Sequence, residues 1–209
     1  MDILKKFSES SNPEAEGRPN SGLFASDGPF KGLEFFTYQN FVPQPDGGVI
    51  VIGERRYYTL DIPKYVFQEN ARYTDEILVA SFGNDGSLKW LSSVPKRQVV
   101  NSVTASYYLH QGKSELYLIF NDHVDNIEYR RNGGDLRLQS YSSPTSSNAI
   151  MVAKVSMDGL VSYQQLGDTS ESNKWISTSY SLSANEENML TLTLNKMLSK
   201  YTFTQYKFP

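Results

Sequence analysis

The feature that most constrains the fold of this chain is a hairpin sequence that occurs twice. Residues 76–90 read EILVASFGNDGSLKW, and residues 149–163, which begin 73 positions later, read AIMVAKVSMDGLVSY. Each copy has an apolar run, an Asp-Gly pair and a second alternating run. Asp-Gly tolerates the positive φ angles that a two-residue hairpin turn needs, so we expect two equivalent antiparallel hairpins. The matched positions include Ile77 and Ile150, Val79 and Val152, Asp85 and Asp158, Gly86 and Gly159, and Trp90 and Tyr163.

Further strand-like runs surround the hairpins in a constant order. An apolar run precedes each hairpin as a second strand, and an aromatic run precedes that one as a first strand. The first strands are expected at 34–42, 103–110 and 176–183, the second strands at 47–54, 114–121 and 187–195, and a last run at 200–208. Two four-stranded units and most of a third therefore fit residues 33–208.

This order predicts an all-β fold made of repeated four-stranded antiparallel units, arranged as a partial β-propeller-like array. The units are expected at about 33–98, 99–167 and 168–209, with Trp90 and Tyr163 in equivalent environments between neighbouring sheets. Aromatic residues make up 13% of the chain, a composition that suits strands. Such an array cannot close a ring, so it would belong to a larger propeller or associate with itself. The alternative fold is a β-sandwich built from duplicated hairpins.

Composition excludes several classes of protein and site. The 20 basic and 23 acidic side chains give a net charge of −3, which does not favour nucleic acid as a partner. No apolar run is long enough to insert into a membrane as a helix. The chain has no cysteine, so it forms no disulfide and no thiolate metal site. Residues 1–32, rich in Ser, Pro, Gly and Glu, are expected to form a flexible N-terminal linker.

The candidate binding surface comes from two connections between second and third strands, at residues 53–75 and 122–148. Insertions at equivalent positions of a repeat emerge on one face, and Arg and Tyr are enriched at binding hot spots. These residues are predicted to contact a protein or a glycan: Arg55, Arg56, Tyr57, Tyr58, His123, Tyr129, Arg130 and Arg131. In the alternative interpretation the loops fold back, with their Arg side chains paired to carboxylates and their Tyr rings buried.

Catalytic and metal sites are weakly indicated. The two histidines, His110 and His123, are not spaced as a helical pair of zinc ligands, and no G-x-S-x-G motif is present. The acidic run at 122–126 could offer oxygen ligands to calcium, but it lacks a complete calcium-binding loop. We therefore predict no cofactor, no metal and no catalytic residue.

Four motifs follow one another along the chain, at Asp46–Glu54, Ile77–Trp90, Pro95–Gln98 and Leu116–Asp122. In this order they resemble the C-terminal portion of uncharacterised, exported β-propeller-like repeat proteins of Bacteroidetes-type bacteria. The resemblance covers residues 33–208. It implies a periplasmic, outer-surface or secreted location, with a signal peptide that is not in this chain. It implies no known activity.

Two functions follow as hypotheses. The favoured one is a non-enzymatic binding or scaffold module of the cell envelope that contacts a protein or glycan through the two connections. Its partner could also be the remainder of a larger propeller or a second copy. The alternative is a propeller-type envelope hydrolase that uses carboxylates such as Glu54 and Asp122. A hydrolase needs a concave pocket where titratable side chains converge, whereas a binding module can present a broad surface.

Overall fold

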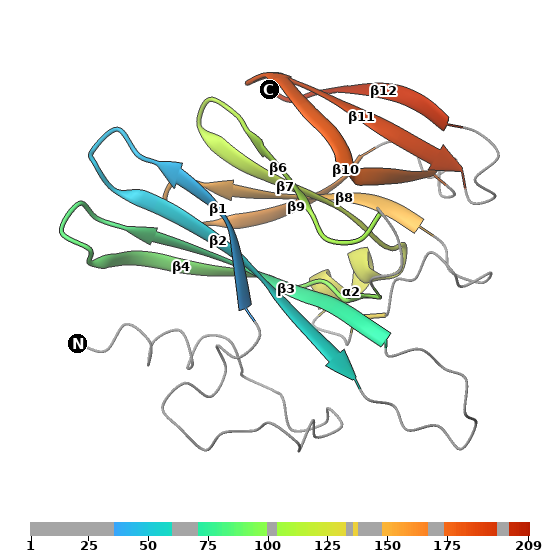
Figure 1. Ribbon diagram of the computed structural model, residues 1–209, viewed down its shortest axis with the longest axis horizontal. Helices are drawn as coiled ribbons and strands as arrows, with labels where there is room; N and C mark the ends of the chain where they lie inside the picture. The colour runs from blue at the N-terminus through green and yellow to red at the C-terminus, as the bar shows by residue number, and fades with distance from the viewer. Residues whose placement is uncertain are drawn as a thin grey trace.

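Three antiparallel sheets follow one another along the chain and pack face to face (Figure 1). The computed structural model describes residues 36–59, 71–99, 104–132, 136–137, 148–166, 174–195 and 201–209. The expected N-terminal linker lies outside these residues. In the described part of the chain one short helix accompanies the strands, so the predicted all-β fold of antiparallel units is confirmed. None of the three sheets closes on itself.

The sheets take their strands in sequence order, as expected for repeated units. The first sheet contains β1 (Phe36–Pro43), β2 (Val49–Thr59), β3 (Ala71–Phe82) and β4 (Leu88–Val94), with β5 (Gln98–Val99) paired to β3. The middle sheet contains β6 (Tyr108–Gln111), β7 (Glu115–His123), β8 (Asn148–Ser156) and β9 (Val161–Leu166). The last sheet contains β10 (Lys174–Asn185), β11 (Asn188–Asn195) and β12 (Tyr201–Lys207). Helix α2 (Asn126–Asn132) lies between β7 and β8. In the described residues no helix is long and apolar enough to cross a bilayer.

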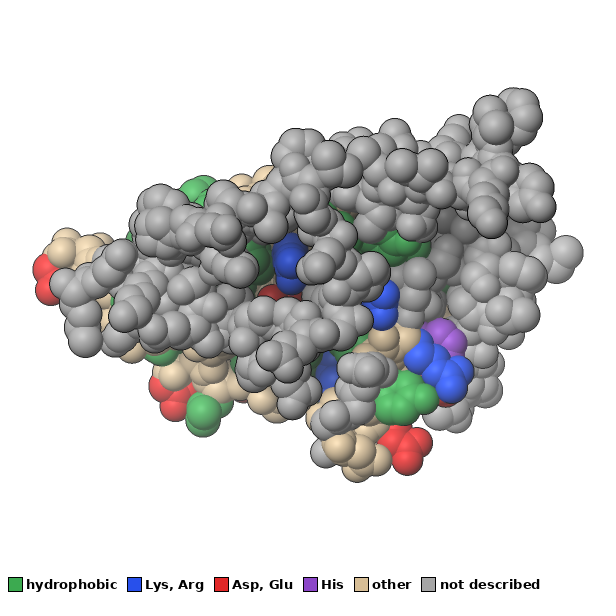
Figure 2. Space-filling model, turned by 90° about the horizontal axis from the view of Figure 1, so that it is seen from below, with side chains coloured by type: hydrophobic (Ala, Val, Ile, Leu, Met, Phe, Trp, Pro, Cys, Tyr) green, Lys and Arg blue, Asp and Glu red, His purple; other side chains and the backbone are tan. Residues whose placement is uncertain are grey.

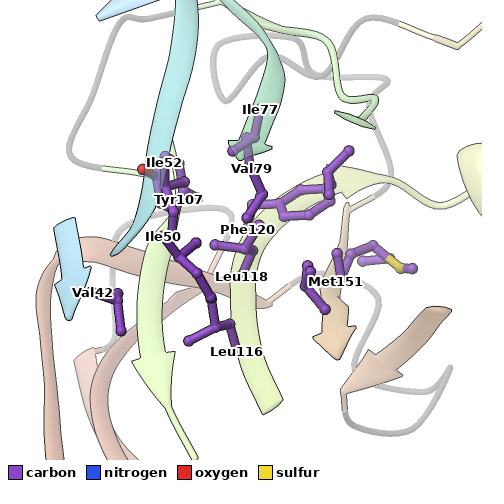
Figure 3. Close-up of a cluster of buried hydrophobic side chains, with 14 residues drawn as sticks. Val42, Ile50, Ile52, Ile77, Val79, Tyr107, Leu116, Leu118, Phe120 and Met151 are labelled. Atoms are coloured by element: carbon purple, nitrogen blue, oxygen red, sulfur yellow. The ribbon is translucent and has the colours of Figure 1, made fainter. Parts of the chain in front are cut away.

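The two central strands of the middle sheet, β7 and β8, are buried on both faces. Along β7, Leu116, Leu118 and Phe120 point into a core shared with the first sheet, where Figure 3 shows them facing Ile50 and Val79. The alternate residues Tyr117 and Ile119 point the other way, into a second core completed by the last sheet. Successive side chains of a strand point to opposite faces, so the unbroken apolar run at 116–120 of β7 suits a middle layer.

Both predicted Asp-Gly turns are present. Gly86 and Gly159 have φ angles of 76° and 87°, and the strands that follow them begin in equivalent register. Phe82 pairs with Leu88 in the first hairpin, as Val155 pairs with Val161 in the second.

The predicted equivalence of Trp90 and Tyr163 is wrong, and a β-bulge is the reason. Trp90 pairs with Ser81, whereas Tyr163 pairs with Ala153, because the first hairpin has one extra residue beyond the turn. One extra residue turns the following side chains to the opposite face of a sheet. Trp90 therefore faces the middle sheet, where its indole N–H donates to the Met157 carbonyl (2.9 Å). Tyr163 lies instead under the Arg130 guanidinium, on the side of the first sheet.

The contact of Trp90 with the second hairpin predicts unequal effects for two matched substitutions. A Cβ atom at Gly159 would lie 2.7 Å from the Trp90 ring, whereas one at Gly86 would meet no atom within 4 Å. Gly86→Ala should cost about 1–2 kcal/mol, since only its positive φ is strained. Gly159→Ala should cost a further 1–3 kcal/mol or so, because the ring must move. Urea denaturation measures both, and equal losses would contradict the inferred contact.

Candidate functional site

A cluster of buried polar side chains lies where the three sheets meet, at the end of the sheets that carries α2. Its members come from β2, β3, β7, β8 and the segment that follows β4. Each of these residues is at most 3% exposed: Glu54, Thr74, Asp75, Lys96, Gln98, Asn121, Asp122 and Asn148. We call this set the buried polar network. Buried charges are costly unless they are paired and hydrogen-bonded, so the partners of each group decide what the network can do.

Glu54 and Lys96 form the centre of the network. The Lys96 ammonium lies 2.7 Å from Glu54 Oε1 and also donates to the Thr74 carbonyl (3.2 Å) and Gln98 Oε1 (3.0 Å). Arg56 Nε and the Ser106 hydroxyl each donate to Glu54 Oε2 at 2.8 Å. Ser106 has a φ of 74°, a strained conformation for a residue with a side chain, and two hydrogen bonds into the network hold it there.

The titration of this pair reflects burial and charge together. Burial alone would raise the pKa of Glu54, but the charge of Lys96 and the hydrogen bonds from Lys96, Arg56 and Ser106 outweigh it and lower that pKa. Burial lowers the pKa of Lys96, and the charges of Glu54, Asp75 and Asp122 oppose this shift. The two side chains therefore form an internal ion pair, and neither is exposed to solvent.

Two residues of α2, Arg130 and Asn126, bind the carboxylate of Asp122. Its carboxylate is paired with Arg130, and it accepts hydrogen bonds from the Asn126 amide (2.6 Å) and the His123 backbone N–H (2.9 Å). Arg130 also donates to the Pro95 carbonyl at 2.7 Å, so it joins the middle sheet to the first. Burial raises the pKa of Asp122, and the charge of Arg130 opposes that shift.

Asn121 connects all three sheets. Its amide nitrogen donates to the Thr104 and Ile176 carbonyls, both at 2.8 Å, and its oxygen accepts from the Ile176 backbone N–H at 2.9 Å. The Asn121 side chain thus makes the pair of hydrogen bonds to the Ile176 backbone of β10 that a neighbouring strand would make. Toward the first sheet, Gln98 Nε2 of β5 donates a hydrogen bond to the backbone carbonyl of Asn121 at 2.6 Å.

The sequence motifs converge on this network. Glu54 ends the first motif, Lys96 and Gln98 belong to the third, and Asn121 and Asp122 end the fourth. Sequence reasoning identified the motifs but missed their joint role, because their contacts span tens of residues. Polar residues that follow apolar strand runs were the signal that could have found it.

The predicted binding residues of the first connection lie in a strand, not in a loop. Strands β2 and β3 stay paired through Tyr57↔Tyr73 and on to Thr59↔Ala71, so this part of the expected 53–75 insertion is wrong. Aromatic residues favour strands, which is why pairing continues. Tyr57 stacks on Tyr73 (5.3 Å between ring centroids) and donates to Asp75 (2.8 Å).

The next two predicted residues of this strand, Arg55 and Arg56, contact different partners. The Arg55 guanidinium lies 5.7 Å from the Tyr57 ring centre, whereas Arg56 is paired with Glu54 and keeps 40% of its side chain exposed. The side chains of Tyr58 and Arg131 lie outside the described residues. The first connection therefore supplies Arg56 to the surface near the network.

The second connection places its predicted residues around α2. Arg130 is only 4% exposed, and the network uses it internally. On the surface, Arg137 pairs with Asp125 (2.8 Å) and donates to the Tyr129 hydroxyl (3.2 Å), while His123 accepts from the Asp125 backbone N–H (3.2 Å). A shallow hollow beside them is lined by Val124, Asp125, Ile127, Glu128 and Asn132. Seen from this end, the molecule presents basic side chains close to a histidine (Figure 2).

His110 lies away from this end, between the middle and last sheets. Its ring is fully buried, stacks on Phe208 (4.6 Å between centroids) and contacts Ser183 Oγ and the Glu186 carbonyl at 2.8 and 3.0 Å. Burial lowers its pKa, which favours the neutral ring. His110 thus holds the last sheet against the middle one.

Glu54 and Asp122 are not placed as the exposed pair of acids that a glycosidase mechanism uses. Glu54 and Asp122 belong to one network, but each is buried and neutralised by a basic partner, so neither can protonate a substrate or activate water as placed here. In the described ranges, no group of three or more His, Asp or Glu side chains is placed to hold a metal ion.

Comparisons with family models, curated proteins and solved structures found no match to this chain. The resemblance drawn from the four motifs therefore stays a prediction.

Proposed function

We propose that this chain is a non-enzymatic binding or scaffold module that contacts a protein or glycan with the surface around α2. One observation carries the proposal. The buried charged groups, Glu54 with Lys96 and Asp122 with Arg130, are paired with one another inside the molecule. At the same end, Arg56, Asp125 and Arg137 keep 40%, 41% and 55% of their side chains exposed to solvent. Together with Tyr129 they offer flat, polar groups beside a shallow hollow, an arrangement that suits recognition of another surface.

The same proposal includes a propeller-like arrangement and a place in the cell envelope or outside the cell. The first is supported by sheets that succeed one another in sequence order with antiparallel strands. The second is supported by the motif resemblance alone. Fractionation of cells that express the full gene product would test the location.

Binding is tested by substituting two exposed basic side chains, one beside α2 and one distant from it. Arg137→Gln and Lys89→Gln each remove one positive charge that is paired with an aspartate at the surface. Lys89 lies in the hairpin of the first sheet, away from α2. With a glycan array and a panel of insoluble polysaccharides as probes, we expect wild type and Lys89→Gln to be retained, and Arg137→Gln to lose at least about tenfold in affinity, as a charged hydrogen bond implies. Equal retention of the two variants would contradict a site around α2.

The hydrolase alternative is examined with the same samples. Chromogenic glycosides should show no turnover that depends on Glu54 or Asp122. Turnover by the wild type that Glu54→Gln abolishes, in a variant that still folds, would replace binding with catalysis.

A further inference from the structure

The outer face of the last sheet carries large apolar side chains that are open to solvent. Leu182, Leu190, Tyr201 and Phe203 are 62%, 38%, 57% and 72% exposed. Leu182 lies opposite Leu190 and Phe203 opposite the partly exposed Leu192, so these side chains form one apolar surface across three strands. Tyr201 extends this surface along β12, whereas Leu194, which lies opposite Tyr201, is only 4% exposed. We call it the outer apolar face.

This face contains no charge in its interior. In the described part of the last sheet, charged residues stand only at strand ends and in the turn, at Lys174, Glu186, Glu187 and Lys207. Two such faces can therefore meet without burying a charge or opposing like charges. Depletion of charged residues is typical of the centre of a protein interface.

The stacking of the sheets explains why the face is apolar. Met189 of β11 packs into the core shared with the middle sheet, while Leu190 and Leu192 alternate to the other side. The last sheet thus carries apolar residues on both faces, as the middle sheet does, but no other sheet of the described residues covers its outer face. At the outer edge of the stack in Figure 1, its outer face repeats the kind of surface that the sheets already use to bind one another.

The area is sufficient for a specific contact. The four exposed side chains present on the order of 500 Å² per copy, so two copies would bury on the order of 1,000 Å², the lower limit for a stable interface. A single symmetric contact of this size is consistent with a dissociation constant on the order of 1–100 μM.

We propose that the outer apolar face binds the same face of a second copy of this chain, as a two-fold symmetric dimer with Phe203 at its centre. A two-fold contact requires a surface that complements itself, and an uncharged apolar sheet meets this requirement. The dimer does not depend on the proposed binding surface around α2, which lies on another side of the molecule.

The dimer is tested by analytical ultracentrifugation of the whole chain over a range that spans 1 μM to about 300 μM. The wild type should shift with concentration from 23.7 kDa toward twice that mass. Phe203→Glu should stay monomeric, since it would place a charge at the centre of the contact. The matched control is Phe41→Glu, which changes a phenylalanine of β1 with a similar exposed fraction (64%) and should dimerise as the wild type does.

A cross-linking measurement keeps the proposal testable if Phe203→Glu fails to fold. Because the chain has no cysteine, Leu190→Cys introduces a single thiol on the face, and Phe41→Cys introduces one elsewhere. A short bifunctional maleimide should join two copies of Leu190→Cys and not of Phe41→Cys. A wild type that stays monomeric at the highest concentration, or cross-linking that is equal for both variants, overturns the proposal. Arg137→Gln should dimerise normally, so a failed dimer and a failed glycan site are separate outcomes.

Discussion

Replacing Lys96 with methionine is expected to lower the free energy of unfolding by about 3–5 kcal/mol. Methionine fills much of the space of the lysine stem but supplies no charge to Glu54, whose carboxylate would keep Arg56 and Ser106 as donors but lose its buried cation. The Thr74 carbonyl and Gln98 Oε1 would also lose a donor. Urea denaturation followed by circular dichroism measures the loss.

The matched control is Lys89→Met. Lys89 is also paired with a carboxylate, that of Asp46, but both side chains are about half exposed. An exposed ion pair contributes no more than about 1 kcal/mol, so this variant should be close to the wild type. In the Lys96→Met background, Glu54→Gln should recover part of the loss because it removes the unpaired charge. If Lys96→Met and Lys89→Met lose equal stability, the network is not a source of stability.

Replacing Asn121 with leucine should cost at least about 3 kcal/mol. Leucine has a similar size but removes three buried hydrogen bonds to backbone groups, those to the N–H and C=O of Ile176 and to the C=O of Thr104, at about 1–3 kcal/mol each. Because two of these groups belong to β10, the last sheet should loosen first. Hydrogen exchange of the Ile176 amide measures this directly.

Asn132→Leu is the control for Asn121→Leu. Asn132 is exposed at the end of α2, where the same change should alter stability by no more than about 0.5 kcal/mol. A normal rate of exchange at Ile176 in Asn121→Leu would contradict the idea that this side chain acts as a neighbour of β10.

The local elements of this fold could be predicted because local rules determine them. Asp85–Gly86 and Asp158–Gly159 specified hairpin turns, and alternating apolar runs specified the strands on either side. Strand ends were less accurate: β2 and β3 continue through aromatic residues that were expected in a loop. The bulge beside Trp90 was missed because no residue type marks it uniquely, and it alone reversed the direction of that side chain.

The candidate site was harder to predict than the strands. Glu54 and Asp122 were identified as interesting acids, but their basic partners, Lys96 and Arg130, become neighbours only after the sheets pack. Asn121 stood at the end of an expected strand and Gln98 at the end of a short motif, and neither was assigned a contact. What they contact depends on the relative placement of three sheets, which propensity and periodicity along one chain do not encode.

Burial of the middle sheet on both sides restricts how a chain of this kind can change in length. Between its two ends, β7 has no position at which a polar replacement would reach water, so the middle unit depends on both of its neighbours. An outer unit can be gained or lost at the cost of one interface. Removal of the middle unit instead breaks two interfaces and leaves Gln98 and Ile176 without Asn121, the residue that joins them. Growth and shortening of the array are therefore confined to its ends.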